Sequence, residues 1–211
     1  MTLPEIKDST ERFLGGFGIF TDESRWDGLY MESLIHKYSR MAIVMQFAKN
    51  KRVNPIWSQQ LILDFSEGLQ DDNCLVKFPI PQFIQLDNER GGIIYAGTIE
   101  GNCQVRVANT RQDLILAQTH RNAKNTTRVL YSDGYLEVYG NTMLEELRVD
   151  AIFLDPTEVK TYNKLKDDYP LNNELVPDMQ KLLFQYEGQF MLQGKVDSKT
   201  NGGDDNATTS R

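Results

Sequence analysis

Side chains able to do chemistry are few in this sequence and lie far apart. The two histidines, His36 and His120, have no Cys and no second His at metal-ligand spacing, so the sequence predicts no metal site. The two cysteines, Cys74 and Cys103, fall in strand-like runs, and we interpret them as small buried side chains rather than a disulfide. His36 falls on a predicted helix, where we expect it at the surface or at its boundary.

Carboxylates are the remaining candidates, because two of them converging in a cleft can act as general acid and general base. Adjacent pairs occur at Asp71-Asp72, Glu145-Glu146 and Asp167-Asp168. Neighbours on a strand point to opposite faces, so Glu145 and Glu146 cannot act together there, and we interpret all three pairs as solvated surface. A glycan-cleaving enzyme is the alternative, and its best candidates are Glu137, Glu145, Glu146 and Asp150.

Motifs for a nucleophile or a nucleotide are missing from the sequence. There is no Gly-x-Ser-x-Gly and no Walker sequence. The run GGFG at residues 15–18 lacks the spacing and the preceding strand of the dinucleotide fingerprint, and it predicts a flexible or tightly turned segment. The sequence therefore predicts no catalytic residue, no metal and no cofactor.

Two clusters of cations could contact a partner. The run KNKR at residues 49–52 closes a predicted helix, where cations complement the helix dipole; contact with a phosphate or a partner is the alternative. A second cluster comprises His120, Arg121, Lys124 and Arg128. We interpret it as a solvated loop, and contact with DNA backbone or an acidic partner is its alternative.

Composition places these side chains in an ordinary globular domain. The chain has 211 residues, of which 40% are hydrophobic and 25% charged, enough to bury a core without disulfides. Its net charge of -7 argues against a protein that adheres to nucleic acid, although DNA could slide past such a surface. The first residues are not typical of a signal peptide, and no apolar run approaches the ~20 residues of a membrane span.

Helical periodicity dominates residues 22–66. Between residues 22 and 49, apolar side chains recur at spacings of three and four and should form one face, comprising Met31, Leu34, Tyr38, Met41, Met45 and Ala48. Asn54 and Pro55 predict the cap and first turn of a second helix. The apolar side of that helix would comprise Ile56, Trp57, Leu61, Ile62 and Phe65.

From residue 74 to residue 155 the apolar period changes to two, which predicts antiparallel strands. Asp133-Gly134 predicts a tight hairpin turn that pairs Tyr131 with Leu136 and Val129 with Val138. A last strand alternates Leu147, Val149, Ala151 and Phe153 with Arg148 and Asp150. The predicted fold class is α+β, with about five antiparallel strands in a sandwich- or barrel-like sheet and helices packed on or beside it.

The chain is expected to end with a connector, a helix and a polar arm. Residues 160–170 hold too few apolar side chains to pack tightly. Residues 172–192 predict an amphipathic helix capped by Asn172 or Asn173. Its stripe should be buried in an assembly and comprises Leu175, Met179, Leu182, Tyr186 and Phe190. Residues 1–194 would form a single domain, and Lys195–Arg211 a flexible arm that gains order, if at all, from a neighbouring chain.

Six ordered segments carry a resemblance to a known family. They are NPIW (54–57), VKFPIPQFIQLD (76–87), YAGTIEGN (95–102), LEVYGN (136–141), AIFLDPTEV (151–159) and DDYPLNNELVPDMQ (167–180). Between roughly residues 30 and 192 the chain resembles structural proteins of tailed phages, especially the crAss-like phages of gut Bacteroides. These segments are not a catalytic signature.

This resemblance implies a virion protein of the head-to-tail connector. Such proteins form many-fold rings, typically twelve-fold, that contact the portal and adjacent neck or tail proteins while genomic DNA passes through the lumen without specific binding. The resemblance implies assembly in the bacterial host cytoplasm, no membrane contact and no catalytic residues. The alternatives are the glycan-cleaving enzyme and a free β-rich module that binds carbohydrate or a host receptor through an exposed aromatic platform.

Overall fold

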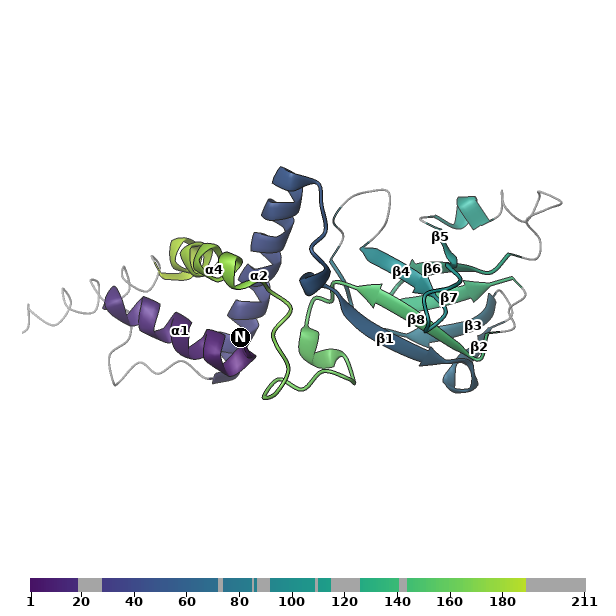
Figure 1. The fold of residues 1–211 in the computed structure, drawn as a ribbon, viewed down its shortest axis with the longest axis horizontal. Coiled ribbons are helices and arrows are strands. Elements are labelled where there is room, and N and C mark those ends of the chain that lie inside the picture. The colour runs from purple at the N-terminus through teal and green to yellow at the C-terminus, as the bar shows by residue number, and fades with distance from the viewer. Residues whose placement is uncertain are drawn as a thin grey trace, which may run out of the picture.

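In the computed structural model, a helical unit lies beside a β unit (Figure 1). The structure describes residues 1–18, 28–71, 74–84, 86, 92–108, 110–114, 126–140 and 144–188. The helical unit contains α1 (Leu3–Gly16), α2 (Gly28–Asn50) and α4 (Val176–Leu183), so segments far apart in the sequence pack together there. The predicted α+β class, with helices beside the sheets, is confirmed.

Helix α1 begins with a capping box and ends in a glycine-rich run. The Glu5 carboxylate accepts a hydrogen bond from the Thr2 N–H at 2.9 Å, as in a capping box, and Pro4 lies in the first turn. Leu3 and Leu14 are buried against the other helices. This helix is not among the sequence-based expectations, and the GGFG run expected as a turn begins inside it.

Helix α2 confirms the predicted first helix from Gly28 onward, and residues 22–27 lie outside the described residues. Its buried face differs from the predicted one in the last turns, where Ile43 and Phe47 are buried while Met45 is 58% exposed. The last turns extend beyond α4, so less of the helix surface is covered there (Figure 1).

The predicted second helix over residues 54–66 is wrong. Asn54 does cap a helical turn, since its side chain accepts from the Ile56 N–H at 3.0 Å, but that turn is a 3-10 turn that ends at Trp57. Residues Gln59–Asp64 then form strand β1. The adjacent apolar residues Leu61 and Ile62 fit either period, but only Leu61 faces the core, and pairing with another strand decides the conformation.

Among the described residues, the β unit contains eight strands in two sheets, where about five strands in a sandwich- or barrel-like sheet were expected. The three-stranded sheet has the order β1 (Gln59–Asp64), β8 (Glu146–Ala151), β4 (Ile93–Gly97). The five-stranded sheet has the order β2 (Leu69–Asp71), β3 (Cys74–Pro79), β7 (Tyr135–Tyr139), β6 (Arg128–Ser132), β5 (Arg106–Ala108). All pairs are antiparallel except β5 with β6.

The two sheets share one apolar core, which makes the β unit a sandwich. Leu147 and Val149 of β8 belong to the same buried cluster as Leu136 and Val138 of β7. The predicted hairpin is confirmed, with Tyr131 opposite Leu136 and Val129 opposite Val138. Its turn places Asp133 at φ 53° and Gly134 at φ 83°, the left-handed pair that this sequence favours.

Truncation of Leu147 tests this shared core. Leu147 is completely buried between the sheets, so Leu147→Ala should lower the free energy of unfolding by about 2–5 kcal/mol. Leu165 is 69% exposed, and the matched substitution Leu165→Ala should change the free energy of unfolding by less than about 0.5 kcal/mol. Denaturant unfolding measures both, and equal effects would contradict the described core.

Candidate functional site

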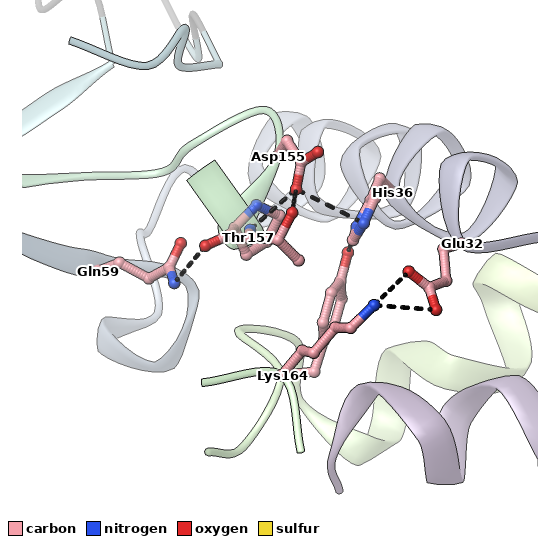
Figure 2. A network of polar contacts seen from close by, with 8 residues as sticks. Glu32, His36, Gln59, Asp155, Thr157 and Lys164 are labelled. Atoms are coloured by element: carbon pink, nitrogen blue, oxygen red, sulfur yellow. Dashed lines mark hydrogen bonds and ion pairs between the residues drawn. The ribbon is translucent and has the colours of Figure 1, made fainter. Parts of the chain in front are cut away.

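A group of converging polar side chains lies where the helical unit meets the β unit (Figure 2). His36, in the middle of α2, is 6% exposed. Its Nδ1 lies 2.8 Å from the Tyr169 hydroxyl oxygen, and its Nε2 lies 3.5 Å from Asp155 Oδ1. The prediction that His36 lies at the surface or boundary is therefore wrong. We call His36, Asp155 and Tyr169 the junction triad.

The β unit positions Asp155 through a short turn that follows β8. Asp155 caps the 3-10 turn Pro156–Glu158, and its Oδ1 accepts hydrogen bonds from Thr157 N at 2.8 Å and Thr157 Oγ1 at 2.6 Å. The Pro156 carbonyl accepts a bond from Gln59 Nε2 of β1 at 3.4 Å. Figure 2 shows these bonds continuing toward His36, so both β1 and the end of β8 reach α2 through this turn.

Tyr169 approaches the same place from the segment that was expected to be a loosely packed connector. That expectation is wrong for its last residues, because Tyr169 and Leu171 are buried in the helical core. Lys164 of the same segment donates to Glu32 of α2, with Nζ–O distances of 3.1 and 3.4 Å. Asn172 accepts a hydrogen bond from the Trp57 indole N–H. The sequence pattern missed this packing because single aromatic residues, rather than an apolar run, bury the segment.

Electrostatics favour a neutral imidazole in the junction triad. Burial lowers the pKa of His36, and nearby Arg40 lowers it further, while Asp155 and Glu32 oppose that shift. Burial also raises the pKa of Tyr169 above its ordinary value, so its hydroxyl stays protonated. For Asp155, burial raises the pKa, but hydrogen bonds from Thr157 together with nearby His36 and Arg40 outweigh burial, and the net shift is downward. An enclosed neutral imidazole bonded to a neutral phenol holds elements together; the triad activates no exposed nucleophile.

The candidate carboxylates of the enzyme hypothesis do not converge. Glu137 is buried on β7, where the Tyr139 hydroxyl donates to it at 2.5 Å and where Lys77 and Arg111 lie 3.5 and 3.6 Å away. Asp150 forms two hydrogen bonds with Arg148, at 2.8 and 2.7 Å. Glu145 and Glu146 are exposed at the start of β8, as predicted. Glu137 and Asp150 therefore lie in environments separate from each other and from that of Glu145 and Glu146.

The cysteines and the metal-ligand side chains form no site within the described residues. Cys74 is half-buried and Cys103 is exposed, both as free thiols, so the prediction that both are buried is wrong for Cys103. Cys103 lies in a bend before β5 rather than inside a strand. No group of three or more His, Cys, Asp or Glu side chains in the described ranges could hold a metal ion.

Of the two cation clusters, only the one at the end of α2 can be located in full. Lys49, Lys51 and Arg52 are exposed, and among the described residues none of them forms an ion pair. His120, Arg121 and Lys124 lie outside the described residues, while Arg128 is half-buried in β6.

The predicted closing helix is confirmed from Asn173 to Gly188, although it begins with the 3-10 turn Asn173–Leu175, and residues 189–192 lie outside the described residues. Helix α4 ends at Leu183, and a π-helical turn follows over Phe184–Gly188. Leu175 and Met179 of the predicted stripe are buried within the chain itself, Leu182 is half-buried, and Tyr186 is 53% exposed. Phe190 and the arm Lys195–Arg211 lie outside the described residues.

Exposed aromatic side chains do not form a platform on the β unit. The large aromatic residues that are exposed in the described ranges are Phe17, Tyr30 and Tyr186, and all three belong to the helical unit. Tyr186 stacks on Tyr38 with ring centroids 6.1 Å apart. This arrangement does not support the carbohydrate-binding alternative.

Comparison with known protein families gives a match. A family model described as "Phage tail ring protein 2" (CrAss_Ring_2) matches residues 20–206. A search of curated proteins finds no match. Within the described residues, no helix combines the length and the apolar character needed to cross a membrane.

The junction triad predicts a pH dependence of stability near neutrality. The lowered pKa of His36 means that below the ordinary value of 6.5 the unfolded chain binds a proton that the folded chain does not. The free energy of unfolding should therefore fall as the pH falls from about 7.5 to about 5.5, a window that lies above the ordinary pKa range of carboxylates. Denaturant unfolding at several pH values measures this slope.

The variant His36→Asn should lose most of that slope, whatever its stability at pH 7.5, because it removes the titrating imidazole. His120→Asn is the matched control and should keep the slope. A His36→Asn protein with the slope of the unaltered chain would contradict the assignment.

Proposed function

Because this chain belongs to the phage tail ring protein 2 family, we propose that it is a subunit of an oligomeric ring in the portal-proximal neck of a tailed phage. In this role the ring joins the portal to the tail and forms part of the channel through which DNA leaves the capsid. The ring is twelve-fold, it assembles on the portal in the bacterial host cytoplasm, and adjacent neck or tail proteins bind its other side.

The junction triad is the observation that best supports this structural role. A ring subunit must present two lateral surfaces and two axial surfaces in a fixed relation, or identical copies cannot close. Buried His36 contacts Tyr169 within the helical unit and partly exposed Asp155 in the turn after β8, so the triad connects the helical unit to the β unit. The body formed by residues 1–194 therefore acts as one block rather than as two flexibly linked parts.

Charge is consistent with a channel for DNA. The net charge of -7 on each copy gives a ring of the same sign as the phosphate backbone, which disfavours adhesion during passage. Among the candidate carboxylates, Glu137 and Asp150 are neutralised by neighbouring cations, and Glu145 and Glu146 are exposed at the start of β8, so we assign the chain no catalytic role. The arm Lys195–Arg211 gains order from a neighbouring chain in the assembly.

Electron microscopy of the chain mixed with the portal protein of its phage tests this proposal. We expect a ring bound to one face of the portal, with the major capsid protein of the same phage as a control that binds no ring. A chain that forms no ring and does not bind the portal at any salt concentration or stoichiometry would contradict the proposal.

A further inference from the structure

The end of α2 carries an ordered surface that we call the basic end: Lys49, Lys51 and Arg52, with the exposed Val44 and Met45 beside them. Lys51 has φ 54°, and its N–H donates to the Phe47 carbonyl at 2.7 Å, which closes the helix with a left-handed residue. Its ammonium nitrogen lies 5.8 Å from the centroid of the Phe47 ring. These contacts hold the backbone that carries the three cations.

The basic end has the composition of a protein interface rather than of a solvated helix terminus. Val44 and Met45 are exposed one turn before the cations, and Ile56 is exposed a few residues after them. Exposed apolar side chains surrounded by charged ones correspond to the core and rim of a protein–protein contact. Phosphate binding alone would not need the apolar side chains.

The end of the β unit that lies away from the helical unit carries a negatively charged surface, which we call the acidic end. It comprises Asp64, Glu145 and Glu146, with Ile62. Asp64 of β1 is the Cα partner of Glu146 of β8, and like charges directly opposite each other destabilise a sheet. Among the described residues, none of the three carboxylates forms an ion pair. Ile62 precedes Asp64 by two residues, so it shares the face of Asp64 and Glu146, and it is 42% exposed.

The two surfaces cannot neutralise each other within one chain. Strand β1 starts beside the helical unit and runs away from it, and β8 starts at that distant side, so the acidic end lies far from the end of α2 (Figure 1). Each chain therefore presents an unpaired basic surface and an unpaired acidic surface in a fixed relation.

We infer that the basic end of one copy docks on the acidic end of the next copy around the ring. This inference rests on the proposed ring function and identifies its lateral contact. A contact between two different patches is heterologous, and repetition of such a contact closes a ring when the rotation permits. Copies that each carry a charge of -7 repel one another on average, so a stable contact must bring opposite charges together locally.

Charge reversal tests this contact with two variants of the full chain. The basic-end variant is Lys49→Glu, Lys51→Glu, Arg52→Glu, and the acidic-end variant is Glu145→Lys, Glu146→Lys. Asp64 is left unchanged because its side chain caps the turn that follows β1. Each variant alone should need a protein concentration more than about tenfold higher for half-maximal ring assembly, because like charges would then face each other.

An equal mixture of the two variants should recover assembly, since each copy then meets a neighbour of opposite sign. A triple variant of exposed cations elsewhere, Arg12→Glu, Lys166→Glu, Lys181→Glu, is the matched control and should assemble as the unaltered chain does. Sedimentation at low ionic strength measures all of these, and added salt should weaken assembly of the unaltered chain.

The inference would be overturned if both variants assemble as the unaltered chain does, or if their mixture does not recover ring assembly. If the basic-end variant assembles normally but binds less double-stranded DNA, the basic end contacts nucleic acid and the inference is wrong. If the unaltered chain forms rings while either of these results is obtained, the lateral contact is wrong but the proposed ring function still holds. Failure of the inference is therefore distinguishable from failure of the proposed function.

Zero-length carbodiimide cross-linking covers the case in which the unaltered chain assembles only weakly on its own. In an equal mixture of isotope-labelled and unlabelled chains with the portal present, amide links should join Lys49 or Lys51 of one copy to Glu145 or Glu146 of another. Links confined to other residue pairs would overturn the inference.

Discussion

The contact of buried His36 with buried Tyr169 and with partly exposed Asp155 is the constraint on which the rest of the structure depends. It joins α2 to the turn after β8 and to the segment that leads into α4, three parts of the chain that are distant in sequence. A buried polar group without a partner is costly, so the three side chains favour the one arrangement in which all are satisfied. The helical unit and the β unit thereby acquire one relative orientation.

That orientation determines how the charged surfaces of the two units are placed relative to each other. The end of α2 belongs to the helical unit and the start of β8 to the β unit, so their separation depends on the junction triad. A ring contact that repeats around an axis requires the same separation in every copy. The triad thus relates folding to the proposed ring assembly.

Patterns that depend on neighbours in sequence were the ones that could be predicted. The hairpin at Asp133-Gly134, the alternation of β8 and the middle of α2 follow from local periodicity and turn chemistry. The six-segment resemblance to a phage ring family is confirmed by the match over residues 20–206, which extends beyond the predicted limits at both ends. Residues 59–64 show the limit of periodicity, since pairing with β8 made them a strand.

The junction triad could not be predicted, because His36 is separated from both Asp155 and Tyr169 by more than one hundred residues and no local pattern relates them. His36 was expected at the surface or at its boundary because the apolar residues around it do not indicate which other segment packs against that part of the helix. The burial of Tyr169 likewise depends on α2, which a connector of mixed composition does not indicate. One signal was available in the sequence. His36 lies beside Ile35 and within one turn of further apolar residues that pack in the core, so a polar side chain at this position is buried if it has a hydrogen-bond partner.

Cryo-electron microscopy of the neck in the intact particle tests the central claim most directly, namely that the chain is a single block in a ring. The account predicts a ring in which each subunit density accepts the helical unit and the β unit together in the orientation set by His36, Asp155 and Tyr169. The account would be contradicted if the chain lay outside the neck, or if the two units had to be placed independently with the triad separated.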